Sequence, residues 1–127
     1  MIKQPALQKH MRLSKVKVNP HLKKELFQTL HKTLADLKNP QDIKDFLEAF
    51  LSGTEHETLA KRVAVSYWLD KGRSYTNIQN NLKVSSATIT NVQKAYSRQK
   101  GVKLALSHIK AEEWANVWAE KIKKLVR

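Results

Sequence analysis

The 127-residue chain has no cysteine, only three glycines and three prolines, and 11 acidic residues against 24 lysines and arginines. Without cysteine, disulfides, thiol catalysis and cysteine-ligated metal sites are excluded. Because so few residues break helices, long helices are expected. No apolar run approaches the roughly 20 residues that cross a bilayer, and the N-terminus lacks the apolar core of a signal peptide. We therefore expect a cytoplasmic protein without a membrane partner.

The scarcity of acids is uneven along the chain. Residues 1–24 carry seven lysines and arginines and no acid, and residues 71–111 carry eight and no acid. The stretch between them holds eight acids and five bases. With a net charge of +13, this distribution predicts a polyanionic partner, nucleic acid before an anionic membrane surface.

Two helices with the same start signal are expected after a basic arm at residues 1–19. Asn19-Pro20 and Asn39-Pro40 each place a capping asparagine before a proline at the first helical position. Apolar residues follow at helical spacing in both segments. In the first they are Leu22, Leu26, Phe27, Leu30, Leu34 and Leu37, and in the second Ile43, Phe46, Leu47, Phe50 and Leu51.

The next helix is expected to start at a capping box, Thr54-x-x-Glu57, and to be closed by Gly72. Its second half, through Leu69, has almost no polar face, so it must be covered on all sides. One layer of helices in so small a domain seldom provides that cover, and a subunit interface is predicted.

A last helix is expected from about residue 110 to the C-terminus, within a helical extension at 99–127. It places Trp114, Trp118, Ile122 and Leu125 on one stripe, with lysines around it. Docking on the protein's own core or on a partner subunit is the favoured interpretation, and a membrane-surface helix is the alternative.

Residues 74–96 have the apolar pattern of a helix-turn-helix. Ser74 can cap a short helix, and Ser85 or Ser86 a second one. Ile78 and Leu82 face inward on the first helix, and Val84 fills the angle between the two. The inward residues of the second helix are Ala87, Ile89, Val92 and Tyr96. Such a pair at a fixed angle lets the second helix enter a major groove.

The remaining polar residues define the candidate DNA contacts. Hydroxyl, amide and lysine side chains can reach base edges, and arginine or lysine beside them meets phosphates. The turn residue Lys83 departs from the usual glycine, which predicts a turn of a different type. The predicted base-reading residues are Ser85, Ser86, Ala87, Thr90, Asn91 and Lys94, and the phosphate contacts are Arg73, Lys83, Arg98 and Lys100.

The stretch from Glu57 to Tyr96, with LAKRVAVSYWLDKG and then SSATITNVQKAY, resembles the Trp-repressor-like helix-turn-helix family. With the two preceding helices the resemblance covers roughly residues 22–96. It implies an all-helical fold of five to six helices that forms an intertwined homodimer, with residues 20–98 as the DNA-binding domain. It also implies a transcriptional repressor in which Ser86, Ala87 and Thr90 face the operator bases.

The same resemblance implies that the tryptophan pocket is incomplete. Tryptophan-responsive members sandwich the indole between two arginines above a glycine. Here Arg62 matches the first arginine, but Asn91 and Val92 stand at the other two positions. We therefore expect no L-tryptophan co-repressor, with Val92 filling the floor of the site.

Three other function classes are an enzyme, a sequence-independent nucleic-acid binder and a protein-interaction adaptor that uses the C-terminal tail. The five histidines lack metal-binding spacing, and no phosphate loop or nucleophile elbow is present, so no enzyme activity, cofactor or metal is expected. The alternative function is a sequence-independent nucleic-acid binder that uses its basic arms, although RNA platforms usually expose stacking aromatics.

Overall fold

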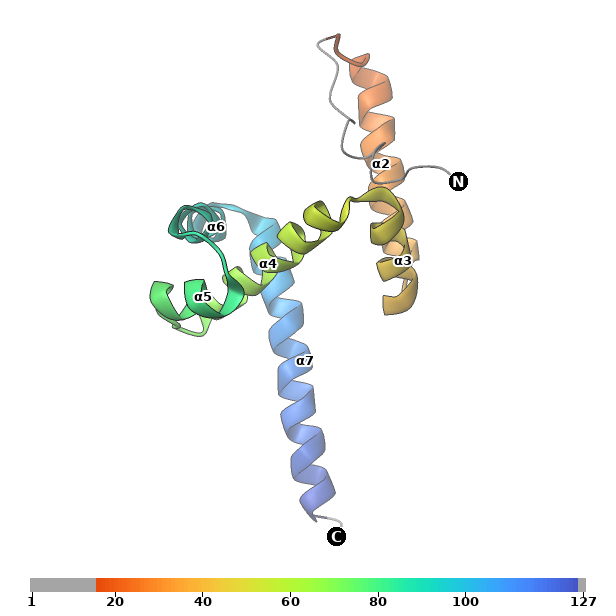
Figure 1. The fold of residues 1–127 in the computed structure, drawn as a ribbon. Coiled ribbons are helices and arrows are strands. Elements are labelled where there is room, and N and C mark those ends of the chain that lie inside the picture. The colour runs from red at the N-terminus through yellow and green to blue at the C-terminus, as the bar shows by residue number, and fades with distance from the viewer. Residues whose placement is uncertain (1–15, 126–127) are drawn as a thin grey trace. The chain divides into compact units, whose positions relative to one another are not determined.

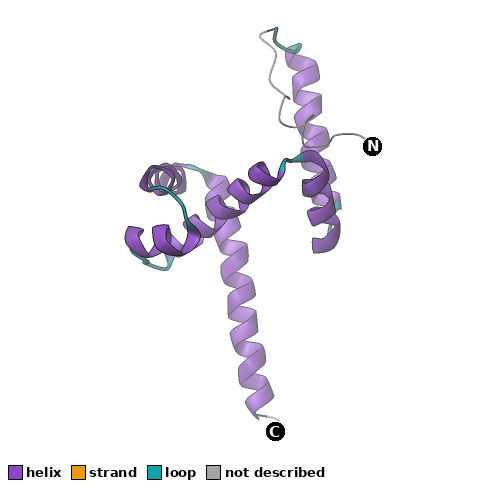
Figure 2. Cartoon of the chain, in the orientation of Figure 1, coloured by secondary structure: helices purple, strands orange, loops and turns teal. Residues whose placement is uncertain are grey.

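The structure is a computed structural model that describes residues 16–125, apart from the side chains of Ser97 and Trp118. The described residues form six helices and no strand, which confirms the predicted all-helical class (Figures 1 and 2). Most of the predicted basic arm, residues 1–19, lies outside the described residues. The helices are α2 (Pro20–Asp36), α3 (Pro40–Phe50), α4 (Gly53–Asp70), α5 (Tyr75–Leu82), α6 (Ser86–Arg98) and α7 (Lys100–Leu125).

The chain divides into two compact units, residues 1–57 and 58–127. In the first unit, α2 and α3 both start as predicted. The Asn19 side chain accepts a hydrogen bond from the backbone N–H of His21 at 2.9 Å, and Asn39 accepts one from Gln41 at 2.8 Å. A proline follows each capping asparagine inside the first turn. The cap accepts from one or two of the N–H groups that a helix start leaves without partners, and the proline removes another.

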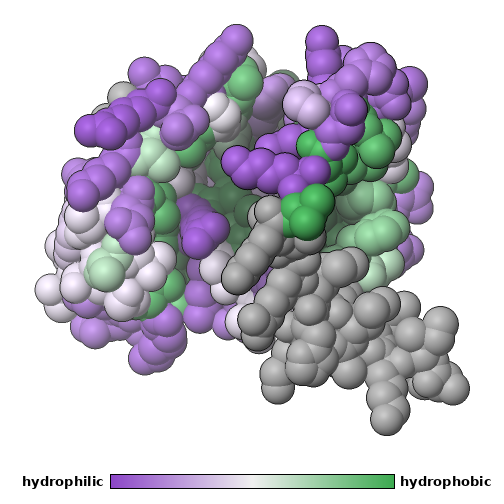
Figure 3. Space-filling view, turned by 90° about the horizontal axis from the view of Figure 1, so that it is seen from above, coloured by the Kyte–Doolittle hydropathy of each residue, from purple (hydrophilic) through white to green (hydrophobic). Residues whose placement is uncertain are grey.

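The apolar stripes of the first unit remain largely accessible. Neither α2 nor α3 contains a buried residue among those described. Leu26 is 54% exposed and Phe50 is 70% exposed, although Phe46 and Phe50 pack ring against ring at 4.9 Å between centroids. Figure 3 shows hydrophobic surface lying among hydrophilic side chains on the face that it presents. Amphipathic spacing thus predicted these helices correctly, but their own unit does not bury their apolar faces.

The start of α4 corrects the predicted capping box. The Ser52 hydroxyl accepts a hydrogen bond from the Glu55 N–H at 3.1 Å, and the Glu55 carboxylate accepts one from the Ser52 N–H at 2.8 Å. The box is therefore Ser52-x-x-Glu55, not Thr54-x-x-Glu57. Both quartets have the required spacing, and the helix begins at the earlier one, which lets Gly53 and Thr54 join its first turn.

The end of α4 follows the prediction. Gly72 has a positive φ of 81° and donates to the Leu69 carbonyl at 3.0 Å, while Arg73 donates to the Trp68 carbonyl at 3.1 Å. These two bonds form a Schellman motif, which needs a left-handed residue that glycine adopts without strain. The motif turns the chain directly into the loop before α5.

The second unit has a small core. Val65 from α4, Ile78 from α5 and both Ile89 and Val92 from α6 form its buried cluster. Around it pack Trp68, Leu69, Tyr75, Leu82 and Val84. The predicted inward residues Ile78, Leu82, Val84, Ile89 and Val92 are therefore confirmed. Ala87 is exposed, so its predicted inward position is wrong; its place at the second residue of α6 puts it beyond the core.

The predicted last helix starts earlier than expected and is one uninterrupted helix, α7, of 26 residues. Near its start Leu106 is buried, at 3% exposure. Farther along, Trp114 and Ile122 are 65% and 55% exposed, and Leu125 is 82% exposed. The stripe residues Trp114, Ile122 and Leu125 of α7 are therefore exposed, and the Trp118 side chain, predicted to belong to the same stripe, lies outside the described residues.

Candidate nucleic-acid interface

The two helices α5 and α6 are joined by a short connection, residues 83–85. Ser74 caps α5 by accepting from the Asn77 N–H at 3.1 Å, and Ser85 caps α6 by accepting from the Thr88 N–H at 3.1 Å. Both serine caps were predicted, and of the two candidates for the second cap the structure selects Ser85. The caps fix where each helix begins and hence which residues of α6 face away from the core.

The conformation of the connection between α5 and α6 corrects the prediction of a different turn type. Lys83 has φ 56° and ψ 52°, the left-handed conformation, and its N–H donates to the Gln79 carbonyl at 3.0 Å. The turn is thus the ordinary type with a left-handed residue after α5, not a different one. A lysine in this region costs about 1 kcal/mol relative to glycine. Lys61 Nζ lies 3.5 Å from the Lys83 carbonyl oxygen, a long contact across from α4.

The buried side of α6 holds the helix against its neighbours. Ile89 is fully buried and Val92 is 7% exposed, and both pack against Val65 and Ile78. At the rim, the Tyr75 hydroxyl of α5 donates a hydrogen bond to the Gln93 side chain of α6. Apolar packing and this polar contact together set the position of α6 relative to α5 and α4.

The opposite side of α6 carries the predicted base-reading residues. All of them are exposed: Ser85, Ser86, Ala87, Thr90, Asn91 and Lys94. Positions 86, 87, 90, 91 and 94 recur at helical spacing and share one face. Ser85 differs from the others, because its hydroxyl is engaged in the cap and lies 3.0 Å from that of Thr88. The exposed face is therefore polar, with a small methyl at Ala87.

The predicted phosphate contacts, Arg73, Lys83, Arg98 and Lys100, are also exposed. Arg73 is held in place, because its guanidinium stacks over the Trp68 ring at 4.3 Å and donates to the Asn77 side chain at 3.2 Å. Arg98 lies in the last turn of α6, where a cation interacts favourably with the helix dipole. In sequence, Arg73 precedes α5, Lys83 lies between the two helices, and Arg98 and Lys100 lie at the end of α6 and just after it.

Two acids of the second unit, Asp70 and Glu113, each have a lysine and a tyrosine as partners. Lys110 Nζ lies 2.7 Å from Asp70, which also accepts a hydrogen bond from the Tyr96 hydroxyl at 2.7 Å. The hydrogen bonds from Lys110 and then Tyr96 hold the pKa of Asp70 below its ordinary value.

The second acid is Glu113 of α7. It accepts hydrogen bonds from the Tyr67 hydroxyl at 2.5 Å and from Lys71 Nζ at 3.0 Å. These bonds, from Tyr67 first and Lys71 second, lower the pKa of the Glu113 carboxyl, and the same contact raises the pKa of the Tyr67 hydroxyl. Neither this pairing nor that of Asp70 was foreseen from the sequence, because the partners lie far apart along the chain.

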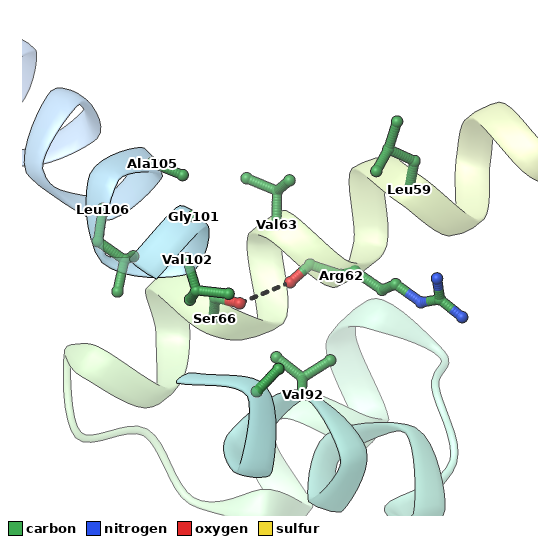
Figure 4. Close-up of a pocket in the computed structure, with 10 residues that line it drawn as sticks. Leu59, Arg62, Val63, Ser66, Val92, Gly101, Val102, Ala105 and Leu106 are labelled. Atoms are coloured by element: carbon green, nitrogen blue, oxygen red, sulfur yellow. Dashed lines mark hydrogen bonds between the residues drawn. The ribbon is translucent and has the colours of Figure 1, made fainter. Parts of the chain in front are cut away.

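A pocket of about 240 Å³ lies beside α6 (Figure 4). Val92 lines it, and the Arg62 guanidinium extends away from the α7 residues of the pocket wall. Val92 is packed as expected. However, the sequence predicted that Val92 would fill the site, and a cavity remains beside it. Asn91 does not line it. The walls are largely apolar: Leu59, Arg62, Val63, Ser66, Val92, Ala95, Gly101, Val102, Ala105 and Leu106.

Residues 16–125 contain neither a candidate metal site nor a candidate membrane span. No group of three or more histidines, cysteines or acids in this range could hold a metal ion. No helix there is long and apolar enough to cross a membrane.

Comparison with known proteins places this geometry in context. Neither the search of curated proteins nor the search of solved structures returned a match. A family model described as Trp repressor protein matches residues 25–108, about two thirds of the chain. The match extends beyond Tyr96 and includes the first turns of α7. Its members are DNA-binding regulators of transcription, which agrees with the polar, acid-free face of α6. The chain therefore belongs to the Trp repressor family.

Proposed function

We propose that this protein is a homodimeric, sequence-specific regulator of transcription, a repressor, that reads the major groove of duplex DNA with α6. The observation that carries the proposal is the two-sidedness of α6. Ile89 and Val92 are buried on one side, while the predicted reading residues are exposed on the other. Reading a major groove requires a helix that packs against the protein on one side and exposes polar side chains on the other.

The exposed face of α6 matches the chemistry of base edges. The Asn91 amide can pair with adenine through two hydrogen bonds, and the Thr90 and Ser86 hydroxyls can donate or accept. The Ala87 methyl is small enough to meet a thymine methyl, and Lys94 can reach guanine. Because the Ser85 hydroxyl already caps the helix, its contribution to reading is the smallest of the set.

Phosphate contacts would orient the reading helix. Arg73 is already ordered by Trp68 and Asn77, so its binding to a phosphate costs little side-chain entropy. Lys83, Arg98 and Lys100 supply further exposed cations near the ends of α6. Such contacts set the register on the duplex but carry no sequence information.

The exposed apolar surface supports a dimer. Leu59 and Val63 of α4 are 44% and 40% exposed, and the leucine stripe of α2 is also accessible. Burying such surface is worth about 25 cal/mol per Å². An intertwined homodimer would cover these faces and present two copies of α6. Sedimentation should give a dimer at micromolar concentration, and a folded monomer there would contradict it.

Residues 20–98 form the DNA-binding domain in this proposal, residues 99–127 a helical extension, and residues 1–19 a basic arm. Selection of binding sites from a random duplex pool tests the function directly. Enrichment of a two-fold symmetric motif is expected. A pool that stays random, with binding that depends on salt alone, would instead support the sequence-independent nucleic-acid binder.

A further inference from the structure

Three helices of the second unit meet at the side chain of Asp70. This carboxylate is 12% exposed, and each of its oxygens has a partner from a different helix. Oδ2 lies 2.7 Å from Lys110 Nζ of α7, and Oδ1 accepts the Tyr96 hydroxyl of α6 at 2.7 Å. Asp70 itself is the last residue of α4. One acid therefore links the end of α4 to both α6 and α7.

The position of Asp70 is unfavourable by itself. The C-terminus of a helix carries partial negative charge, so an acid there is repelled. A carboxylate with little exposure also loses hydration, which only charged or hydrogen-bonded partners offset. Lys110 and Tyr96 supply these partners. The acid is thus stable only while α6 and α7 stay in register with α4.

Tyr96 extends the support of α6 toward its C-terminus. The packed residues of α6, Ile89 and Val92, lie nearer its middle. Tyr96 lies one turn beyond Val92, on the same side. The hydrogen bond to Asp70 therefore holds the end of α6 that apolar packing leaves least constrained.

A second cluster of hydrogen bonds joins α7 to the C-terminal end of α4. Glu113 of α7 binds Tyr67 of α4 and Lys71, which directly follows α4, and it lies three residues after Lys110. This contact joins α7 to α4 but does not include α6. Lys110 and Glu113 both follow His108, where the family match ends. The support from α7 thus comes from a part of the chain that the family model does not cover.

We propose that Tyr96, Asp70 and Lys110 are positioning residues, through which α7 braces the C-terminal end of α6 in the pose that reads DNA. The inference rests on the proposed function of α6. The brace is built from the chain itself, because the Tyr96 hydroxyl of α6 is held by Asp70 and Asp70 is in turn held by Lys110 of α7.

Two matched tyrosine variants test the brace. Tyr96→Phe and Tyr67→Phe each remove one hydroxyl that donates to a carboxylate, and each keeps the ring. Only Tyr96→Phe removes a hydrogen bond between α6 and Asp70. We expect it to lower the ratio of affinities for the selected site and for scrambled duplex about tenfold, the scale of one hydrogen bond to a charged group. Tyr67→Phe should leave this ratio unchanged.

A matched lysine pair tests the contribution of α7. Lys110→Met and Lys103→Met each remove one positive charge from α7, and Lys103 is exposed. Both should weaken binding to any DNA, but only Lys110→Met should lower the ratio of affinities. A ratio that is equal in Lys110→Met and Lys103→Met, or in Tyr96→Phe and Tyr67→Phe, would overturn the brace.

Amide hydrogen exchange provides a readout that does not depend on DNA. Residues 93–98 should exchange faster in Tyr96→Phe than in the wild type, with no such change in Tyr67→Phe. Equal exchange in both variants would overturn the proposal. If the wild-type protein selected no DNA sequence, the proposed function would fail, and the exchange data would still decide whether Tyr96 braces α6.

Discussion

Lys110 Nζ lies 2.7 Å from Asp70 Oδ2, joining α7 to the last residue of α4. Because this contact and the Tyr96 hydroxyl lower the pKa of Asp70 in the folded state, its carboxylate stabilises the fold above the pKa of the unfolded chain, about 3.9. That stability is lost as the pH falls through the lower, folded pKa. We expect urea denaturation to show a free energy of unfolding that drops below about pH 4, and drops less steeply in Asp70→Asn. An acid dependence identical in the two proteins would contradict the assignment.

Replacing either candidate cap of α4 tests which capping box is used. Ser52→Ala removes the acceptor for the Glu55 N–H and should lower the free energy of unfolding by about 1 kcal/mol. Thr54→Ala changes a residue inside the first turn and should be nearly neutral. Denaturation of the two variants side by side distinguishes the boxes, and the reverse order would restore Thr54 as the cap.

The left-handed residue in the turn before α6 predicts a gain in stability on substitution. Lys83→Gly should raise the free energy of unfolding by up to about 1 kcal/mol, since glycine adopts a φ of 56° without a Cβ penalty. Lys83→Ala keeps the penalty and removes the same charge, so it is the matched control. Equal stability of the two variants would mean that the turn carries no strain.

Exposed residues on and beside α6 should separate into two classes. Thr90→Ala and Asn91→Ala are expected to cost about 1–3 kcal/mol on the selected site and little on scrambled duplex. Lys83→Ala and Arg98→Ala should weaken binding to both, and each should reduce the slope of log affinity against log salt by about 0.9. Uniform effects from all four would show that α6 does not read sequence.

We expect no response to L-tryptophan. An indole sandwiched between two cations needs a second arginine, and Asn91 is too short to supply that wall. Val92 adds a branched side chain where a glycine would leave space, and the remaining pocket is lined mainly by hydrocarbon. Calorimetry should detect no saturable binding at micromolar concentration. Tryptophan-dependent affinity for the selected DNA site would show that the pocket beside Val92 is a co-repressor site.

Local sequence determined much of this fold, because helix starts and stops depend on residues three or four apart. Asn19, Asn39, Ser74 and Ser85 cap helices, and Gly72 closes one, through contacts that short-range spacing already implies. The burial of apolar residues in α5 and α6 likewise follows from helical periodicity. The polar face of α6 could be recognised in the same way, as the side of the helix that carries none of the buried apolar residues.

Only the tertiary structure decided those features that the spacing of residues along one helix does not determine. Two overlapping quartets could form the capping box of α4, and only the actual helix start selected Ser52. The contacts of Asp70 with Tyr96 and Lys110 depend on the register between α4, α6 and α7, and Tyr96 is 26 residues away along the chain. That register comes from the packing of side chains around the core. No pattern within one helix encodes it, because it is a relation between surfaces that exist only after the helices have formed.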